Sequence, residues 1–312
     1  MNRLMAGVIG VGHLGRHHAR ILASHHSVNL AAVADADSSR AREIAQEYGA
    51  ESFQDYHLLL PLVQAVIIAT PTTSHFPIAR DCLQAGKHVL LEKPIAQTLE
   101  EADILIGLAQ SAGCCFQIGH SERFNPAIRQ ARSLIQNPRF VEIHRIGPFA
   151  GRGTDVDVVL DLMIHDLDLL IDWVNSPVTA VDAVGVPVLS STVDIANARI
   201  KFACGAVANL TASRASLEPL RKIRIFGANS YISIDARAQE VLIVRRDLEA
   251  AVARDNPMAG IVPQQLAVDK GEPLKGEIYA FINSILGGLP PEVGGADARR
   301  ALALAQQIKT LI

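Results

Sequence analysis

The stretch Gly10-Val11-Gly12-His13-Leu14-Gly15 carries three glycines in the order G-x-G-x-x-G. An apolar run, Met5–Val11, leads into it, and a helical pattern over His13–Ser24 follows. In this setting the first glycine permits a tight turn, the second lets a pyrophosphate approach backbone N–H groups, and the third lets helix and strand pack closely. The helix N-terminus adds partial positive charge for phosphates. The stretch therefore predicts a Rossmann-type dinucleotide site.

The second predicted strand, Leu30–Ala34, leads directly to an acidic residue, Asp35. An acid at this place accepts hydrogen bonds from ribose hydroxyls and repels a 2′-phosphate, so Asp35 favours NAD over NADP. Arg40 follows one helical turn later. It is either a contact that softens this preference or an ordinary solvated helix residue.

Strand and helix patterns alternate over the first 120 residues. Short runs rich in Val and Ile predict buried parallel strands at Met5–Val11, Leu30–Ala34, Ala65–Ala69, His88–Leu91 and Cys114–Ile118. Helical patterns lie at His13–Ser24, Ser38–Tyr48, Ser74–Ala85 and Thr98–Ser111, with a shorter one between Asp55 and Pro61. This alternation predicts an α/β fold with a doubly wound parallel sheet over residues 1–120, the NAD-binding domain.

The pattern changes after Gly119. We expect helices at Asn125–Gln136 and Val156–Val174 around a strand at Phe140–Ile146. Further strands are expected at Val178–Leu189, Ala196–Ala203, Ala206–Ala212, Lys222–Gly227, Tyr231–Asp235 and Gln239–Val244. Residues 246–274 contain three prolines and little periodicity, so we expect them to be irregular, and helices at Leu274–Leu286 and Ala296–Leu311 end the chain. Consecutive strands predict an α+β domain over 121–312 with an open-faced, mostly antiparallel sheet. The last helices could pack back on the first domain.

Composition limits the classes of function. Hydrophobic residues make up 49% and charged residues 20%, and the net charge is −3 without a long Lys/Arg run, which argues against nucleic acid and membrane surfaces as partners. The four cysteines lack CxxC spacing, which suggests buried free thiols in a reducing compartment. Because the N-terminal apolar run lacks a cleavage site and no run approaches the ~18 apolar residues of a membrane span, we expect a cytoplasmic protein.

Two polar segments follow predicted strands of the first domain. Thr70-Pro71-Thr72 follows the third strand, with His75 opening the next helix, and Glu92-Lys93-Pro94 follows the fourth. Ligands of open α/β sheets bind at the carboxyl ends of the strands. We therefore expect cofactor contacts from these segments, and chemistry from Lys93, for which a surface lysine in a loop is the alternative.

Three histidines in the first helix raise the question of a metal site. His13 and His17 are four positions apart and share a helix face with room for His18 beside them. This helix should pack on the sheet and point at phosphates, with no acidic or thiol partner nearby. We therefore expect no metal there.

The predicted helix Val156–Val174 carries five polar residues at intervals of four, four, three and four: Asp157, Asp161, His165, Asp168 and Asp172. Such spacing forms one narrow stripe on an otherwise apolar helix, with Asp155 and Asp166 roughly opposite. The stripe is either the solvated edge of a buried helix or the wall of a polar cleft, in which Asp161 orients the imidazole of His165.

The chain resembles the Gfo/Idh/MocA family of sugar and inositol dehydrogenases over nearly its whole length. The resemblance rests on the segments GVGHLGRHHARI, ATPTTSH, LLEKPIA, GHSERFNPAI, DLMIHDLD and GGADARRALALA. It implies a Rossmann domain, an open-faced sheet domain and catalytic positions at Lys93 of EKP and His165 of DxxxH. Ala296 and Ala298 depart from the usual residues of the last segment, which should not affect chemistry. An open sheet rich in Val, Ile and Ala suits pairing of subunits, so a homodimer or homotetramer is expected.

Within that family, two segments resemble enzymes that oxidise nucleotide sugars at C3: GHSERFNPAI and the run from Gly147 to Asp168. The resemblance implies UDP-N-acetylglucosamine as substrate and a 3-keto product that is aminated in lipid A or surface-polysaccharide synthesis. A diphosphate requires cations, for which Arg123, Arg145 and Arg152 are candidates, with Asn125 beside Arg123. Each arginine could equally form a structural salt bridge.

The expected reaction is oxidation of a secondary ring alcohol by hydride transfer to NAD. His165 is the expected general base, with Asp161 holding its tautomer, and Lys93 stabilises charge on the alcohol oxygen. The reverse assignment applies if Lys93 is desolvated enough to lose its proton. Two other functions stay open: a dehydrogenase of a free sugar, inositol or other polyol, and a non-catalytic NAD-dependent sensor, which would not be expected to retain Lys93 and His165.

Overall fold

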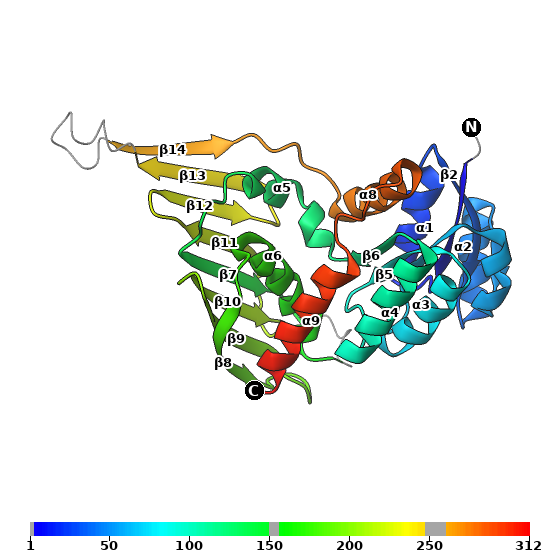
Figure 1. Cartoon of the computed structure of the whole chain (residues 1–312), viewed down its shortest axis with the longest axis horizontal. Helices are drawn as coiled ribbons and strands as arrows, with labels where there is room; N and C mark the ends of the chain where they lie inside the picture. The colour runs from blue at the N-terminus through cyan, green and yellow to red at the C-terminus, as the bar shows by residue number, and fades with distance from the viewer. Residues whose placement is uncertain (1–2, 150–155, 247–259) are drawn as a thin grey trace. The chain divides into compact units, whose positions relative to one another are not determined.

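The computed structural model describes residues 3–149, 156–246 and 260–312. The chain divides into two compact units, the first comprising residues 1–121 and 274–299 and the second residues 122–273 and 300–312 (Figure 1). The helix that begins at Pro273 thus falls almost wholly in the first unit. Within the described ranges, no helix has both the length and the apolar character that crossing a membrane requires.

The first unit contains a six-stranded parallel sheet in the order β3-β2-β1-β4-β5-β6. Its strands are β1 (Leu4–Ile9), β2 (Val28–Ala34), β3 (Glu51–Phe53), β4 (Ala65–Ile68), β5 (His88–Glu92) and β6 (Phe116–Gly119). Its helices are α1 (Gly15–Ser24), α2 (Ser38–Tyr48), α3 (His75–Gln84), α4 (Leu99–Ala112) and α8 (Pro273–Gly287). The strand order reverses between β1 and β4, which confirms the predicted doubly wound sheet and places a ligand crevice at that point.

Residues of α1, α2 and α8 share one hydrophobic core with β1, β2 and β4. The helices α3 and α4 pack against each other. Because βαβ crossovers are right-handed and the chain runs outward from β1 in one direction and from β4 in the other, α3 and α4 belong to the opposite face.

Local sequence sets the ends of these helices. Asp37 caps α2 by accepting hydrogen bonds from two backbone N–H groups, and Thr98 and Glu101 form a reciprocal capping box at the start of α4. Gly49 and Gly113 end the same two helices with φ of 70° and 63°, a left-handed conformation that favours glycine.

Two short features differ from the predictions for this unit. The three-residue strand β3 is too short to produce an alternating pattern, so the sequence gives no signal for it. The segment between Asp55 and Pro61 forms two single 3₁₀ turns, Tyr56–Leu58 and Leu60–Leu62, where one short helix was expected.

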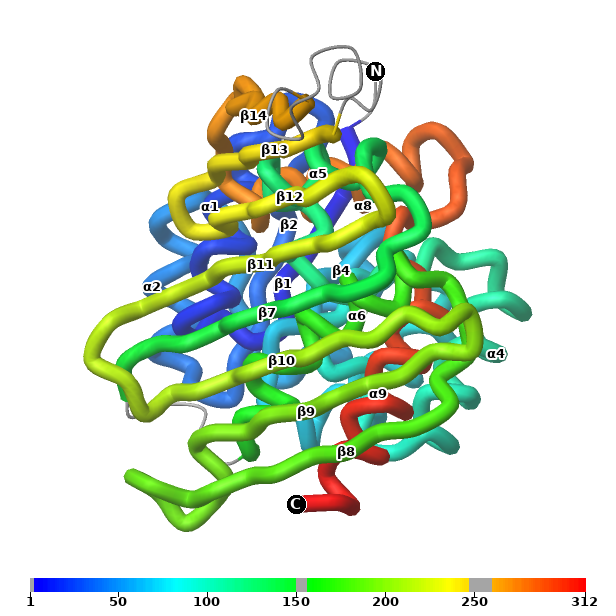
Figure 2. The backbone as a smooth tube through the Cα atoms, turned by 90° about the vertical axis from the view of Figure 1, so that its left-hand side faces the viewer, coloured from blue at the N-terminus to red at the C-terminus, as the bar shows by residue number. Residues whose placement is uncertain are grey.

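The second unit contains an eight-stranded sheet in the order β14-β13-β12-β11-β7-β10-β9-β8, which Figure 2 shows strand by strand. The strands are β7 (Phe140–Ile146), β8 (Val178–Val186), β9 (Ile195–Phe202), β10 (Val207–Ser213), β11 (Leu220–Phe226), β12 (Ser230–Asp235), β13 (Glu240–Arg246) and β14 (Ile261–Leu266). β7 and β10 are parallel and the other pairs are antiparallel, as predicted for this α+β domain.

One face of this sheet packs against helices. Alternate strand residues join a core with residues of α5 (Pro126–Arg132), α6 (Ile164–Val174) and α9 (Gly295–Lys309). The opposite face carries no other element of the unit among the described residues, as Figure 2 shows. The predicted open-faced sheet is therefore confirmed.

Three predictions for this unit are corrected. The helix expected over Asn125–Gln136 ends at Arg132, with Asn137 in a left-handed conformation and a proline after it. The irregular region expected over 246–274 contains β14, which pairs with β13 although it includes a proline, because it is an edge strand. The long helix expected from Val156 is a π-helical turn, Val159–Met163, followed by α6.

Candidate active site

The glycine loop follows β1, and each of its three glycines is needed for a different reason. Gly10 has a φ of 84°, and a Cβ there would lie 2.7 Å from the Ala69 carbonyl oxygen. A Cβ on Gly15 would lie 1.8 Å from the Gly10 carbonyl oxygen, so only glycine allows α1 to start at this point. A Cβ on Gly12 would meet a single atom near 3.9 Å, which leaves open space over the loop. This geometry matches the roles that the sequence predicts.

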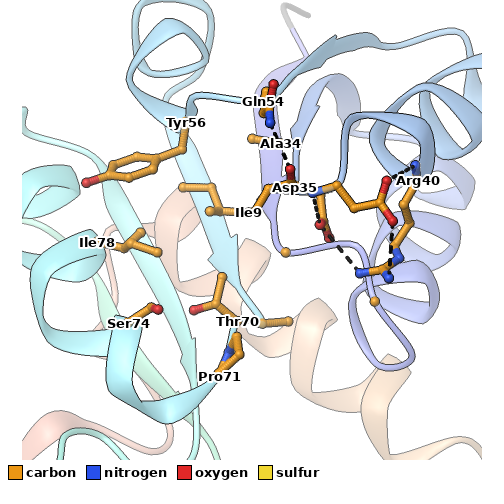
Figure 3. A pocket seen from close by; sticks show the side chains of 15 residues that line it. Ile9, Ala34, Asp35, Arg40, Gln54, Tyr56, Thr70, Pro71, Ser74 and Ile78 are labelled. Atoms are coloured by element: carbon orange, nitrogen blue, oxygen red, sulfur yellow. Dashed lines mark hydrogen bonds and ion pairs between the residues drawn. The ribbon is translucent and has the colours of Figure 1, made fainter.

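A cavity of about 670 Å³ lies beside this loop at the carboxyl ends of β1, β2 and β4. Figure 3 shows Asp35 and Arg40 on one side of it, and Thr70, Pro71 and Ser74 on the other. Leu14 and His13 belong to the loop itself, before the first turn of α1. Other residues that line the cavity were not singled out by the sequence, among them Asp37, Gln54, Tyr56 and Ile78. Gln54 and Tyr56 follow β3, the strand for which the pattern gave no signal.

Asp35 holds the loop in shape as well as facing the cavity. Its Oδ2 accepts a hydrogen bond from the Val11 N–H at 2.9 Å, and its Oδ1 accepts one from the Asp37 N–H at 2.9 Å. Arg40 Nη1 lies 3.4 Å from the same Oδ1, so its charge is directed at Asp35 as well as at Asp37. A carboxylate offers about four lone-pair sites, so Asp35 retains acceptor capacity for ribose hydroxyls. The cavity, the open loop and this acid together fit a dinucleotide.

His75 joins two of the segments that follow strands. Its Nδ1 lies 2.8 Å from the Pro94 carbonyl oxygen and its Nε2 lies 2.9 Å from the Thr70 carbonyl oxygen. Burial lowers the pKa of the ring, against the opposing effect of these carbonyls. His75 therefore ties the turn after β4 to the turn after β5, while Thr72 begins the short 3₁₀ turn between them.

Glu92 and Lys93 form the end of β5 and the turn that follows it. Glu92 is buried, and its Oε1 lies 2.8 Å from His18 Nε2 of α1. The expectation that the histidines of this helix have no acidic neighbour is therefore wrong for His18. Lys93 is half-buried at the carboxyl edge of the sheet. In the described part of the chain, no group of three or more His, Cys, Asp or Glu side chains could hold a metal.

In the second unit, Asp161 lies in the π-helical turn and His165 in the first turn of α6, and both are half-buried. A π turn adds one residue to the helical repeat, so the polar residues before Ile164 are in a different phase from the one that a regular helix would give them. π turns inside helices are frequent at functional sites.

The other acids of this helix form ion pairs within the second unit. Asp168 is 1% exposed and lies 2.6 Å from Arg123 Nε, and Asp172 lies 2.9 Å from Arg123 Nη1. Asp166, expected on the side opposite the stripe, is also buried and pairs with Arg145 at 2.7 Å. Acids on both sides of the helix are therefore neutralised by arginines of the same unit.

These pairs bear on the residues expected to contact substrate. Two carboxylates already neutralise Arg123, which weighs against a free charge for a diphosphate. Asn125 caps α5 through Oδ1 and donates from Nδ2 to the Ala236 carbonyl oxygen at 2.8 Å. Arg145 is buried between Asp166 and Glu122. Arg152 lies outside the described residues.

A Rossmann unit with a glycine-lined cavity and an acid at its second strand, joined to a unit with an open, mostly antiparallel sheet, is the arrangement expected of an NAD-dependent oxidoreductase. Residues 4–120 match the oxidoreductase family with an NAD-binding Rossmann fold, and residues 127–233 match the GFO/IDH/MocA C-terminal domain. The chain belongs to the Gfo/Idh/MocA oxidoreductase family, as its motifs indicated.

Two relatives extend over almost the whole chain. UDP-N-acetylglucosamine 3-dehydrogenase from Acidithiobacillus ferrooxidans is 39% identical over 100% of this chain and 98% of its own length. The solved structure of that enzyme matches with a TM-score of 0.92 over the same shares of the two chains. Myo-inositol 2-dehydrogenase from Thermotoga maritima is 27% identical over 97% of this chain and 94% of its own length.

Proposed function

We propose that this enzyme oxidises the C3 hydroxyl of UDP-N-acetylglucosamine to the 3-keto sugar with NAD. The observation that carries the proposal is the similarity to UDP-N-acetylglucosamine 3-dehydrogenase, which runs through both units at 39% identity. The product would be a substrate for an amination reaction, as in lipid A synthesis.

The first unit would hold the cofactor. The glycine loop would bind the pyrophosphate and Asp35 would bind the ribose. The turn from Thr70 to Thr72 would form the opposite wall of the cavity. Bound NAD supplies the hydride acceptor. The Asp35 carboxylate opposes a 2′-phosphate, so NADP is the weaker cofactor even with Arg40 nearby.

Three side chains would assist removal of the proton from the substrate alcohol. His165 accepts it as general base, because a free imidazole titrates at about 6.5 and so takes up protons near neutral pH. Asp161 holds the tautomer of that ring, and the Lys93 ammonium stabilises negative charge on the alcohol oxygen. The reverse assignment, with Lys93 as base and His165 as donor, uses the same residues.

The direct test follows formation of reduced cofactor by absorbance with purified enzyme and a panel of substrates. The panel contains UDP-N-acetylglucosamine, the corresponding uronic acid, free N-acetylglucosamine and myo-inositol. We expect the two UDP-sugars to be oxidised with far higher kcat/KM than the free sugar. Turnover of myo-inositol alone would replace the proposal with a polyol dehydrogenase, the activity named for the Thermotoga maritima relative. Tight NAD binding without turnover of any sugar would indicate a sensor.

The proton assignment is tested by the pH dependence of kcat in Lys93→Met and His165→Asn. General acid–base groups contribute about 10²- to 10⁴-fold, so His165→Asn should lose activity within that range. Loss of one charge-stabilising donor costs about 10²- to 10³-fold, which is the range expected for Lys93→Met. The acidic limb of the profile should vanish in His165→Asn and persist in Lys93→Met. A His165→Asn enzyme with a near-normal rate at every pH would reject His165 as base.

The open face of the eight-stranded sheet supports a homodimer or homotetramer in solution. The four cysteines are free thiols, in keeping with a cytoplasmic enzyme. Cys82 is buried, but Cys204 is exposed, so the expectation of buried thiols is wrong for Cys204. Light scattering during gel filtration measures the assembly, and a monomer at micromolar concentration would reject it.

A further inference from the structure

Glu277 of α8 is a buried acid for which the proposed reaction has no use. The residue is fully buried, and neither carboxyl oxygen has a hydrogen-bond partner among the described residues. Buried polar atoms without partners are rare in native proteins, and each one calls for a physical reason. The position of Glu277 in the first unit supplies one.

Glu277 lies next to a buried polar cluster that residues of β5 and β6 form, since Gln117 donates to its carbonyl oxygen and the charge of Glu92 acts on its carboxyl group. These parallel strands pair Leu90 with Gln117 and Glu92 with Gly119, so these four residues point to one face of the sheet. Leu90 packs with residues of α1 and α8, so this is the face of the sheet that these two helices cover.

Each covering helix adds one group to this cluster. From α1, His18 places Nε2 2.8 Å from Glu92 Oε1. From α8, the Glu277 carbonyl oxygen accepts a hydrogen bond from Gln117 Nε2 at 3.0 Å. Two carboxyl groups, an imidazole and an amide thus share a buried layer, and Lys93 is the next residue along the chain from Glu92.

We propose that Glu277 is kept as a neutral carboxylic acid and that, in this form, it is a positioning residue for Lys93. The inference rests on the proposed role of Lys93 in catalysis. An ionised Glu277 would put a second negative charge near Glu92 in a buried layer. Two such charges repel strongly in a low dielectric, and an unpaired buried carboxylate is costly by itself. A single proton on Glu277 removes both costs.

The Glu92 carboxylate has little room to respond to a second charge. A Cβ on Gly119 would lie 2.8 Å from Glu92 Oε2, so the carboxylate fills the space that this glycine leaves open. His18 holds its other oxygen. Repulsion from Glu277 would therefore be relieved by moving the end of β5, and with it the turn that carries Lys93.

The charged groups around Glu277 agree with a neutral acid. Burial, and then the charge of Glu92, raise the pKa of Glu277 well above its ordinary value of 4.5. His18 on α1 is engaged with Glu92, and β6 contributes the neutral Gln117. On α8 itself, the Lys275 ammonium lies over the Tyr279 ring at 5.3 Å from its centroid. None of these contacts supplies Glu277 with a cation.

The protonation state is tested on the whole protein without any substrate. The infrared difference spectrum between wild type and Glu277→Gln near neutral pH should contain the band of a protonated carboxyl group. Since folding raises the pKa of Glu277, its stabilising contribution is complete below the unfolded value and is lost as pH rises toward the folded value. The free energy of unfolding of wild type, relative to Glu277→Gln, should therefore fall as pH rises above about 4.5. A carboxylate band near neutral pH, or an unchanged difference across pH, overturns the proposal.

The positioning role is tested by the alkaline limb of kcat. When Glu277 ionises, log kcat of wild type should fall with an additional slope of about one per pH unit that Glu277→Gln and Glu277→Leu lack. Glu43→Gln removes an exposed acid of α2 and should retain the wild-type profile. A wild-type alkaline limb in both Glu277 variants overturns the role.

A second readout separates this inference from the proposed function. The rate at which acetic anhydride acetylates the Lys93 amine, followed by peptide mass spectrometry, requires no turnover. Its pH dependence should differ between wild type and both Glu277 variants, and match between wild type and Glu43→Gln. If no sugar is oxidised, the proposed function fails while this measurement still decides the inference, and identical labelling in all four proteins would overturn it.

Discussion

Lys309 Nζ lies 2.8 Å from Asp157 Oδ2, and this ion pair ties the last turn of α9 to the start of the π-helical turn. The Asp157 Oδ1 accepts hydrogen bonds from the backbone N–H groups of Val159 and Leu160 at 3.0 and 3.1 Å. One carboxylate therefore caps the segment that presents Asp161 and His165 and also anchors it to the end of the chain. The segment that carries the proposed base is thus anchored by a residue almost 150 positions away in sequence.

Replacing Lys309 by Met should lower kcat by a few-fold and leave the KM for NAD unchanged. The ion pair is half-exposed, and such pairs contribute about 0.2–1 kcal/mol, which corresponds to at most about a fivefold change in rate. Steady-state kinetics measures both quantities. Lys270→Met is the matched control, because Lys270 pairs with Glu240 across 3.9 Å at an exposed site of the same unit. Equal kinetics in the two variants would argue against an anchoring role for Lys309.

Replacing Arg123 by Met should destabilise the second unit. Asp168 is buried, and removing one partner of a buried ion pair costs about 3–5 kcal/mol because the other charge stays uncompensated. Urea unfolding gives the free energy. Adding Asp168→Asn should recover part of the loss, since the double variant has no unpaired charge at that position.

The same variant separates a structural arginine from a substrate ligand. Arg132→Met serves as control, because the Arg132 side chain is 61% exposed and pairs with Asp172, which also pairs with Arg123, so its loss should cost no more than about 1 kcal/mol. If Arg123→Met kept wild-type stability and instead raised the KM for a UDP-sugar, Arg123 would be the diphosphate ligand that the sequence suggested.

The first unit was predictable because its signals are local. Buried parallel strands are continuous apolar runs, and the glycines and caps mark the helix ends within one or two residues. β3 was missed because three residues are too few for a pattern, and β14 because prolines usually exclude a strand.

The acidic helix shows what a local pattern leaves out. Its spacing fits a regular helix, and nothing in the sequence marks the π turn that changes the positions of the side chains around the helix between Asp157 and His165. Arg123 and Asp168 are 45 positions apart, so no helical period connects them. For the same reason Glu277 gave no signal, since its neighbours Glu92 and Gln117 come from distant segments that only the fold brings together.

Replacing Gly15 by Ala should abolish NAD binding. The new Cβ would lie 1.8 Å from the Gly10 carbonyl oxygen, so the first turn of α1 would have to move away from the loop that is proposed to hold the pyrophosphate. Gly107→Ala is the matched control, because Gly107 lies within α4 and a Cβ there meets no atom within 4 Å. In a helix interior, alanine is more stable than glycine by up to about 1 kcal/mol, so this control should unfold at a slightly higher temperature than wild type. Calorimetric titration with NAD and thermal unfolding compare the variants, and wild-type affinity in Gly15→Ala would show that the loop tolerates the displacement.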